Sequence, residues 1–215
     1  MSWDITDTIG LGNPPPTILS PLDGAEMVLV SAGPFTMGIS ESELLQILTL
    51  DQRQNPIFAT EYPARQLALK AFYIDRYPVT NYQYRKFIKA TGHRKPLLID
   101  ETGWGQPMQP VVFVGWEDAR AYARWTGKSL PTEAQWEKAG RGSDRRWWAW
   151  GNEFADDCCN SRELGLNCTS EIGRFDRGAS PYGCYDMSGN VWEMCEGRWL
   201  ENYKPMRGGC FLGSA

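Results

Sequence analysis

The sequence contains almost no histidine and no long hydrophobic run. His93 is the only histidine in the 215 residues, so a metal centre that needs two imidazoles, such as the iron site with two histidines and one carboxylate, cannot form within this chain. No stretch of about 20 apolar residues occurs, so a membrane-spanning helix is not predicted. The opening MSWDITDTIG has neither the basic nor the apolar segment of a signal peptide, and we therefore expect a cytoplasmic protein.

Basic residues are too few and too dispersed for a nucleic-acid interface. The net charge is -4, from 22 basic and 26 acidic residues, whereas nucleic-acid-binding domains carry a concentrated positive patch. The one basic run consists of Arg141, Arg145 and Arg146, beside three tryptophans. Such a combination could stack single-stranded bases, but a solvated turn that leads into a tryptophan-rich core is the favoured interpretation. We therefore expect no nucleic-acid partner.

The motifs of several common catalytic sites are missing as well. The sequence has no GxSxG nucleophile motif and no glycine-rich phosphate-binding loop. The cysteines form no CxxC pair and show none of the paired spacings of a zinc site. Their even number is compatible with three disulfides or with free buried thiols. All six lie in the last third of the chain: Cys158, Cys159, Cys168, Cys184, Cys195 and Cys210.

The composition is that of a globular protein with unusually large and unusually small residues. Hydrophobic residues make up 42% of the chain and charged residues 22%, which is enough for a buried core. The 10 Trp, 22 Gly and 14 Pro indicate many loops around a few large side chains. Prolines 14–16 favour extended backbone. We therefore expect an extended N-terminal leader over residues 1–24 and one α+β domain over residues 25–215.

Four short segments have the composition and pattern of β-strands. Residues 27–30 and 35–38 are apolar and flank a Ser-Ala-Gly-Pro turn, which predicts a hairpin. Residues 66–77 alternate between apolar and polar side chains, as a half-buried strand does. Residues 111–114 are apolar and partly β-branched, which predicts a further strand.

Capping residues and apolar spacing predict helices in the first two thirds of the chain. Apolar residues recur at helical spacing over residues 41–50 and 117–126. Thr80 is the expected N-cap of another helix, which ends at Gly92. Thr132 opens a Thr-Glu-Ala-Gln sequence that approximates a capping box, so a helix is expected to follow it. Beyond residue 141 the pattern indicates turns and short strands.

Three segments carry sequence motifs in a fixed order: MVLVSAGPFTMG from Met27, VGWEDA through GKSLPTEAQWE from Val114, and YGCYDMSGNVWEM from Tyr182. Together these motifs resemble the formylglycine-generating enzyme (sulfatase-modifying factor) family. The resemblance covers residues 26–211. It implies a variant of the C-type lectin fold, loop-rich, with short helices and small antiparallel sheets. Four tryptophans are expected to pin loops to the sheet from the core: Trp116, Trp125, Trp136 and Trp192.

The third motif contains a candidate metal site. Asp186 and Glu193 offer hard carboxylate oxygens, which suit calcium, and Gly189 permits a tight turn that could add backbone carbonyls. The resemblance implies a structural calcium held by Asp186, Gly189, Val191 and Glu193, although Asp186 stands where the family often has asparagine. The alternative is a loop stabilised only by side-chain hydrogen bonds to the backbone.

A second, weaker calcium site is implied upstream, and its motif is incomplete. The resemblance points to Asn160 and Ser161 as ligands. The segment that follows them departs from the family pattern at Gly165, and the acidic residue expected further downstream is missing.

The resemblance also implies a catalytic copper site that this sequence does not reproduce. The family's oxidase binds copper(I) through two cysteines a few residues apart, and soft thiolates suit that ion. Counted from the double glycine at residues 208–209, the first copper cysteine falls on Gly213. Cys210 is the only displaced candidate nearby, and a structural thiol is the favoured interpretation. No catalytic residue is therefore predicted.

Two hypotheses of function follow. The first is a non-catalytic binding or scaffold module that is stabilised by calcium and binds a protein or peptide. The second is a formylglycine-generating oxidase that converts a sulfatase cysteine with copper and O2, whose active-site end lies outside this sequence. The family pattern continues past Ala215 with a closing strand, so the domain is expected to be truncated there, and a partner is expected to complete the open sheet edge.

Overall fold

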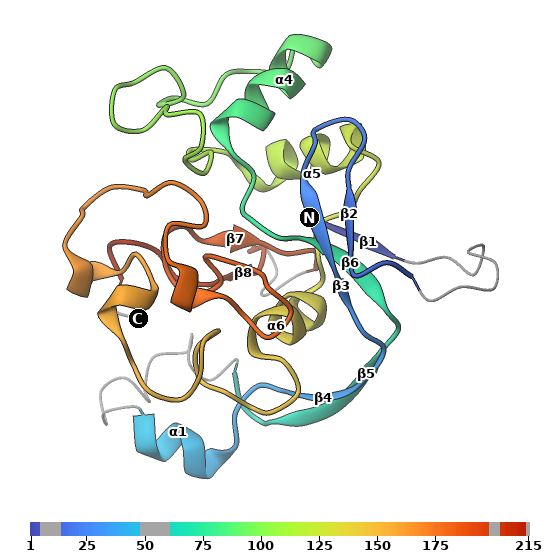
Figure 1. Ribbon diagram of the computed structural model, residues 1–215, viewed down its shortest axis with the longest axis vertical. Helices are drawn as coiled ribbons and strands as arrows, with labels where there is room; N and C mark the ends of the chain where they lie inside the picture. The colour runs from blue at the N-terminus through green and yellow to red at the C-terminus, as the bar shows by residue number, and fades with distance from the viewer. Residues whose placement is uncertain (5–13, 48–60, 198–202, 214–215) are drawn as a thin grey trace.

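A four-stranded antiparallel sheet, in the order β1-β6-β3-β2, forms one side of the fold (Figure 1). The computed structural model describes residues 1–4, 14–47, 61–197 and 203–213. The other described strands form two separate two-stranded sheets, the ribbons β4-β5 and β7-β8. The strands are β1 Ser2–Asp4, β2 Thr17–Leu19, β3 Glu26–Val30, β4 Gly33–Met37, β5 Arg65–Leu69, β6 Phe72–Asp75, β7 Glu193–Met194 and β8 Met206–Arg207.

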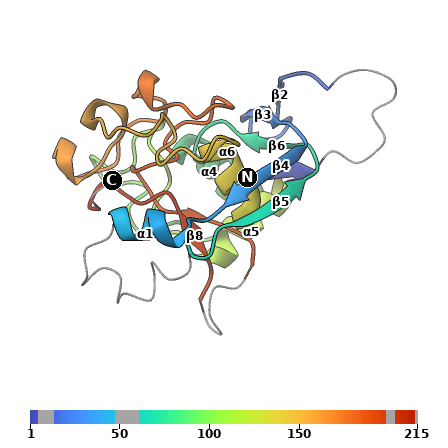
Figure 2. The same cartoon turned by 90° about the horizontal axis from the view of Figure 1, so that it is seen from below.

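The predicted hairpin of residues 27–30 and 35–38 is wrong in its pairing. Both strands exist, but β3 pairs with β2 on one edge and β6 on the other, so it has no free edge for β4. β4 pairs instead with β5. For the same reason the single strand predicted over residues 66–77 is divided into β5 and β6, which belong to different sheets. Seen from below, the β4-β5 ribbon leads away from the main sheet toward α1 (Figure 2).

The segment 1–24 supplies both outer strands of the main sheet. β1 pairs with β6, so this edge of β6 is covered by the chain itself and is not open. Ser2 also forms a bridge to Ser129 on the outer side of β1, through backbone hydrogen bonds of 2.9 and 3.1 Å. β2 covers the opposite side, against β3.

The predicted helices are confirmed, and their ends follow the expected caps. Thr80 and Thr132 each form a complete capping box, and Gly92 ends its helix in the left-handed conformation. Of the helix expected over residues 41–50, the first seven residues are helical and the last three lie outside the described residues. The helices are α1 Glu41–Ile47, α4 Asn81–Thr91, α5 Trp116–Trp125 and α6 Glu133–Arg141.

Two apolar clusters lie beneath the sheet and helices. The first joins β3 and β6 to α6, where Trp136 and Ala139 pack against the sheet. The second joins α4 to α5 through the rings of Tyr84, Phe87 and Tyr122. In Figure 1, α6 lies between the sheet and the irregular half of the chain.

The described residues of the last third, 142–197 and 203–213, are almost entirely turns, with three single-turn helices and the short β7-β8 ribbon. The short helices are η1 Asp156–Cys158, η2 Arg162–Leu164 and η3 Asp176–Gly178. The α+β, C-type-lectin-like class is therefore confirmed. The strand predicted over residues 111–114 is wrong, because Phe113 has a φ of 57° and only Pro110 forms a bridge, to Thr80.

The four tryptophans were expected to lie in the core, which is confirmed for Trp136 and wrong for Trp192. Trp136 is 5% exposed. Trp192 is 51% exposed and directly precedes the half-buried two-residue strand β7. Trp116 and Trp125 are half-buried.

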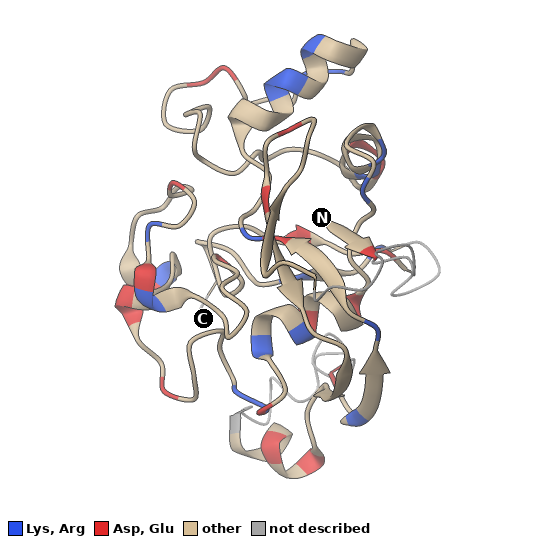
Figure 3. Ribbon diagram, turned by 45° about the vertical axis from the view of Figure 1, so that its right-hand side comes forward, with Lys and Arg blue, Asp and Glu red and all other residues tan. Residues whose placement is uncertain are grey.

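Charges are mixed along the chain, with neither sign confined to one part of the ribbon (Figure 3). The three arginines of the basic run form ion pairs: Arg141 with Glu137, Arg145 with the distant Glu43, and Arg146 with Asp144. None of the described helices is long and apolar enough to cross a membrane.

Candidate functional site

Three of the four residues proposed for calcium, Asp186, Gly189 and Val191, lie in the loop that leads from η3 into β7, and Glu193 is the first residue of β7. Asp186, Gly189 and Asn190 have φ values of 58°, 105° and 61°. This left-handed region strongly favours glycine and tolerates Asp and Asn better than other residues. The Asp-Met-Ser-Gly-Asn sequence therefore supplies the residue types that the turn requires.

Backbone hydrogen bonds from two distant segments hold this turn. The Asn190 amide donates to the Asn160 carbonyl at 2.7 Å, and the Gly189 amide donates to the Gly208 carbonyl at 2.6 Å. The Phe211 amide donates in turn to the Asn190 carbonyl at 3.1 Å. A Cβ added at Gly189 would lie 2.6 Å from the Asn160 carbonyl oxygen. Only glycine at position 189 allows these two segments of the chain to approach each other this closely.

Asp186 points into the protein and has few donors. Its Oδ2 accepts a hydrogen bond from the Gly173 amide at 3.1 Å, and its Oδ1 accepts one from the Asn190 side chain at 3.2 Å. Burial outweighs these two bonds and raises the pKa of Asp186 to about 6. The charged carboxylate is therefore under-compensated by the protein.

Glu193 is under-compensated to a greater degree. Its Oε2 accepts a hydrogen bond from the Trp136 indole at 3.1 Å. Its Oε1 is buried and has no hydrogen-bond partner among the described residues. Burial raises the pKa of Glu193 to about 7, and the negative charge of Asp186 contributes to the increase. A bare carboxylate oxygen in such a place requires a proton or a cation.

These observations fit an oxygen-ligated cation. No group of three or more His, Cys, Asp or Glu side chains in the described part of the chain could hold a metal, so backbone carbonyls would have to complete the ligand set. The structure brings Val191 and Glu193 to the same cavity wall and places Gly189 in the turn before them. Calcium accepts mixed carboxylate and carbonyl ligands of this kind.

The weaker second site is a pocket of neutral oxygens. Asn160 and Ser161 are 0% and 1% exposed, and Asn160 Oδ1 and Ser161 Oγ have no hydrogen-bond partner in the described structure. The hydroxyls of Thr169 and Ser170 are also buried and unpaired. The Asn160 side-chain amide donates to the Cys168 carbonyl at 2.9 Å. None of these five residues is acidic, so these side chains by themselves would not balance the charge of a divalent cation.

The cysteines are free thiols, which leaves the disulfide alternative unsupported. Cys158, Cys159, Cys184 and Cys195 are buried, and Cys168 and Cys210 are half-buried. Burial raises the pKa of Cys159 to about 11 and that of Cys184 to about 12, and it raises the pKa values of Cys158 and Cys195 as well. These four thiols therefore carry little thiolate, the form that binds copper(I) and attacks electrophiles.

Cys210 lies in a short loop that closes over the irregular half. Its carbonyl accepts a hydrogen bond from the Gly213 amide at 2.9 Å, and the Gly213 carbonyl accepts one from the Arg162 amide at 3.0 Å. The neighbouring Phe211 ring packs against Trp104 at 5.7 Å between centroids. The residue at the first copper position, Gly213, thus has a backbone role.

His93 is partly exposed and bonded to a carboxylate. Its Nε2 lies 2.9 Å from Asp118 Oδ1, and Arg94 also donates to Asp118. The Gly115 amide donates to the same carboxylate at 2.7 Å and starts α5. This arrangement fixes the loop after α4 to the next helix.

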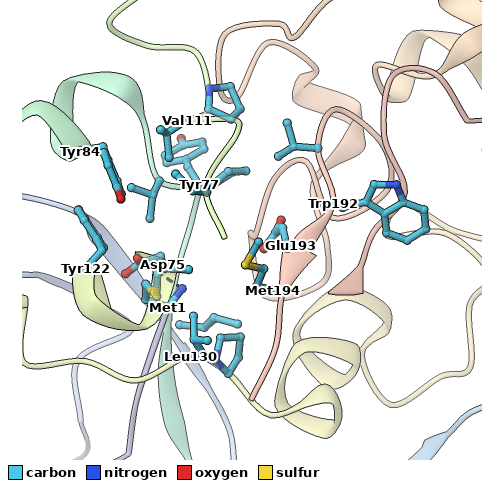
Figure 4. A pocket seen from close by; sticks show the side chains of 18 of the residues that line it. Met1, Asp75, Tyr77, Tyr84, Val111, Tyr122, Leu130, Trp192, Glu193 and Met194 are labelled. Carbon is cyan, nitrogen blue, oxygen red and sulfur yellow. Dashed lines mark ion pairs between the residues drawn. The ribbon is translucent and has the colours of Figure 1, made fainter. Parts of the chain in front are cut away.

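Sequence patterns did not reveal two further features near the site. The first is a buried ion cluster in which Lys128 Nζ lies 2.8 Å from Asp23 and 2.9 Å from Asp75. The second is a cavity beside Glu193, bounded by α4, α5 and β6 (Figure 4). The sequence around Lys128 does not indicate that its side chain pairs with Asp23, which lies 105 residues away. The cavity is lined by residues from segments that meet only in the fold.

Comparison with known proteins shows the family of this chain. The family model of the sulfatase-modifying factor enzyme 1-like domain matches residues 18–215. The formylglycine-generating enzyme of Thermomonospora curvata is 34% identical over 199 residues, which cover 66% of this chain and 65% of that protein. The inactive C-alpha-formylglycine-generating enzyme 2 of Bos taurus is 30% identical over 212 residues, covering 72% and 70% of the two chains.

A solved structure extends the similarity to the fold. PvdO from Pseudomonas aeruginosa superimposes with a TM-score of 0.74 at 25% identity, over 95% of this chain and 89% of PvdO. The chain spans less than two thirds of the length of the Thermomonospora enzyme. The relatives include a protein named as a formylglycine-generating enzyme and a protein named as an inactive one. On the match over residues 18–215, the chain belongs to the sulfatase-modifying factor enzyme 1-like domain family.

Proposed function

We propose that this domain is a non-catalytic binding or scaffold module, stabilised by calcium held by Asp186, Gly189, Val191 and Glu193. The observation that carries the calcium assignment is the buried, unpartnered Oε1 of Glu193. A divalent cation would compensate the charge of both carboxylates, which the protein alone does not do.

Thermal unfolding with and without calcium tests this assignment. With free calcium at 100 times its Kd, a single site adds about 2.7 kcal/mol, so we expect EDTA to lower the Tm by about 5 to 10 °C in a domain of this size. Readdition of calcium, but not of magnesium at the same concentration, should restore the Tm, because this ligand set suits the larger ion.

A matched pair of variants assigns the effect to the site. Glu193→Gln should abolish the response to EDTA, because the amide oxygen cannot balance the cation's charge. Glu101→Gln removes an exposed carboxylate and should respond as the wild type does. Equal Tm values of the wild type in calcium and in EDTA would rule out the calcium part of the proposal.

The non-catalytic part rests on Gly213, which occupies the position of the first copper cysteine. The buried thiols of Cys159 and Cys184 are consistent with this, because burial raises their pKa values and disfavours the thiolate in the metal-free protein. Members of the family named as inactive show that the domain also occurs without the activity. A protein or peptide is the proposed partner, and exposed apolar side chains such as Trp192 and Leu212 would contact it.

A second candidate function is the oxidase itself, favoured by the 34% identity to an enzyme of that name. Incubation of a sulfatase-type cysteine peptide with the protein, copper(I) and O2 separates the two functions. We expect no aldehyde product by mass spectrometry, while the Thermomonospora enzyme converts the peptide under the same conditions. Copper-dependent turnover by this chain would replace the scaffold proposal with the oxidase.

A further inference from the structure

A cavity of about 100 Å³ opens between β6, the helices α4 and α5, and the segment that ends in β7 (Figure 4). Its walls are mainly apolar, with Ile74, Val111, Ala119 and Met187 among them. Apolar cavities of a similar size, about 150 Å³ in one engineered protein, bind benzene. The space is therefore suited to a single small ring.

One polar atom in this cavity is left without any partner or assigned role. Tyr84 is 1% exposed, and its hydroxyl oxygen is buried with no hydrogen-bond partner in the described structure. The ring is fixed, because it stacks on Tyr122 at 5.7 Å and meets the edge of Phe87 at 5.2 Å. In Figure 4, Tyr84 and Tyr122 lie on one side of the cavity and Glu193 on the other. A buried hydroxyl that cannot turn away needs a partner within the cavity.

The charged groups around the cavity already interact with one another. The lining residues, all of them described, include Asp75, Glu193 and Met1, whose α-ammonium lies 3.5 Å from Asp75 Oδ2, but no lysine, arginine or histidine. Asp75 already accepts hydrogen bonds from Lys128 Nζ at 2.9 and 3.0 Å. The Glu193 carboxylate accepts a hydrogen bond from the Trp136 indole, and the Met1 α-ammonium stabilises its negative charge. An uncharged ligand is therefore preferred.

We propose that this cavity binds an uncharged ring of the size of phenol that carries one hydrogen-bond acceptor, to which the Tyr84 hydroxyl donates. Trp192, which is half-exposed, also lines the cavity and marks its rim. The site goes beyond the proposed scaffold function and requires neither calcium nor a protein partner. The same ring could come from a free small molecule or from a tyrosine side chain of a partner.

Titration with phenol, followed by protein NMR, tests the proposal on the whole chain. We expect saturable shifts with phenol, weaker binding of benzene, which lacks the acceptor, and no binding of benzoate. Tyr84→Phe should lower the affinity for phenol by about threefold to tenfold, the usual net contribution of one hydrogen bond, and should leave the affinity for benzene unchanged. Tyr82→Phe, at an exposed position of α4, is the matched control.

Filling the cavity gives an independent readout. Ala119→Leu adds three carbon atoms to the wall and should abolish phenol binding. Val111→Phe, at a half-buried position, serves the same purpose if the first variant does not fold. Phenol binding that persists in a folded filled variant, or a Tyr84→Phe effect equal for phenol and benzene, would overturn the proposal. So would the absence of saturable phenol binding to the wild type.

A last arm identifies the source of the ring. N-acetyltyrosinamide carries the same phenol on a peptide-like group. Its binding at the same site would indicate a tyrosine of a partner, and binding of phenol alone would indicate a free small molecule. Both results support the site. Because the titration is run in EDTA and in calcium, its result does not depend on the calcium assignment.

Discussion

The two halves of the chain are stabilised in different ways. Up to residue 141 the backbone follows helices and strands whose ends carry local caps, as at Thr80 and Thr132. Beyond residue 141, distant backbone groups hold the turns, as at Gly189 and Asn190. Of the five described non-glycine residues with positive φ, four lie in this second half: Arg145, Asn167, Asp186 and Asn190.

The difference explains where the candidate site lies. In a helix or sheet, the backbone N–H and C=O groups form hydrogen bonds with one another. In a turn, many of these groups need hydrogen bonds from neighbouring segments or ligands. The irregular half can therefore place Asp186 in a turn and Glu193 at the start of β7, and offer backbone carbonyls from the residues between them. The regular half contributes the rigid wall, with Trp136 on α6 donating to Glu193.

The largest effect is expected from the charged core of the regular half. Lys128→Met removes the cation that Asp23 and Asp75 share, and breaking a buried pair in this way costs about 3 to 5 kcal/mol. Urea denaturation measures the loss. The triple variant with Asp23→Asn and Asp75→Asn should recover part of it, because the stranded carboxylates are then gone. A loss below about 1 kcal/mol would show that the cluster is not a stabilising feature.

In the irregular half, Gly189→Ala is expected to cost about 3 kcal/mol, because the added Cβ meets the Asn160 carbonyl and the φ of 105° is strained for alanine. Gly183→Ala is the matched control: its φ is 80°, but nothing lies within 4 Å of the added Cβ. Thermal unfolding of both variants separates strain from collision. Equal losses would contradict the close approach of the two segments.

A smaller, pH-dependent effect is expected at Asp23. Burial tends to raise its pKa, but attraction to Lys128 and hydrogen bonds from Lys128 and Tyr122 outweigh burial and lower the pKa from 3.8 to about 2. The folded state therefore binds this proton less readily than the unfolded state. This contributes about 2 kcal/mol that is present above pH 4 and lost as the pH falls through 2.

The difference in unfolding free energy between the wild type and Asp23→Asn isolates this contribution. It should stay constant above pH 5 and shrink toward pH 2, because the wild type loses its charge there and the variant has none to lose. A difference that does not change with pH would show that the carboxylate charge is not what stabilises the cluster.

The smallest effect is expected at the helix caps. Thr132→Ala removes the hydroxyl that accepts from the Gln135 amide at 3.2 Å and should cost about 1 kcal/mol. Thr132→Ser retains the hydroxyl and should stay within a few tenths of a kcal/mol of the wild type. Chemical denaturation of the three proteins measures both values. An equal loss in the two variants would point to the methyl group and away from the cap.

The local sequence was sufficient to predict the helices, but it was not sufficient to predict which strands pair. Thr80, Gly92 and Thr132 mark helix ends because capping bonds join residues that are neighbours in sequence. Pairing depends on which edges are free, and the sequence near β3 does not show that β2 and β6 already occupy both of its edges. The apolar residues 111–114 similarly resembled a strand, although no strand is available to pair with them among the described residues.

The site divides in the same way. By itself, the sequence determined the family, the α+β class and the residues around Asp186 and Glu193, because the motifs and the turn-forming residues are contiguous. Only the tertiary structure decided that Glu193 Oε1 is buried without a partner, that Lys128 joins two aspartates, and that Tyr84 faces a cavity. Burial and pairing between distant residues depend on how separate segments pack, and no local pattern records that packing.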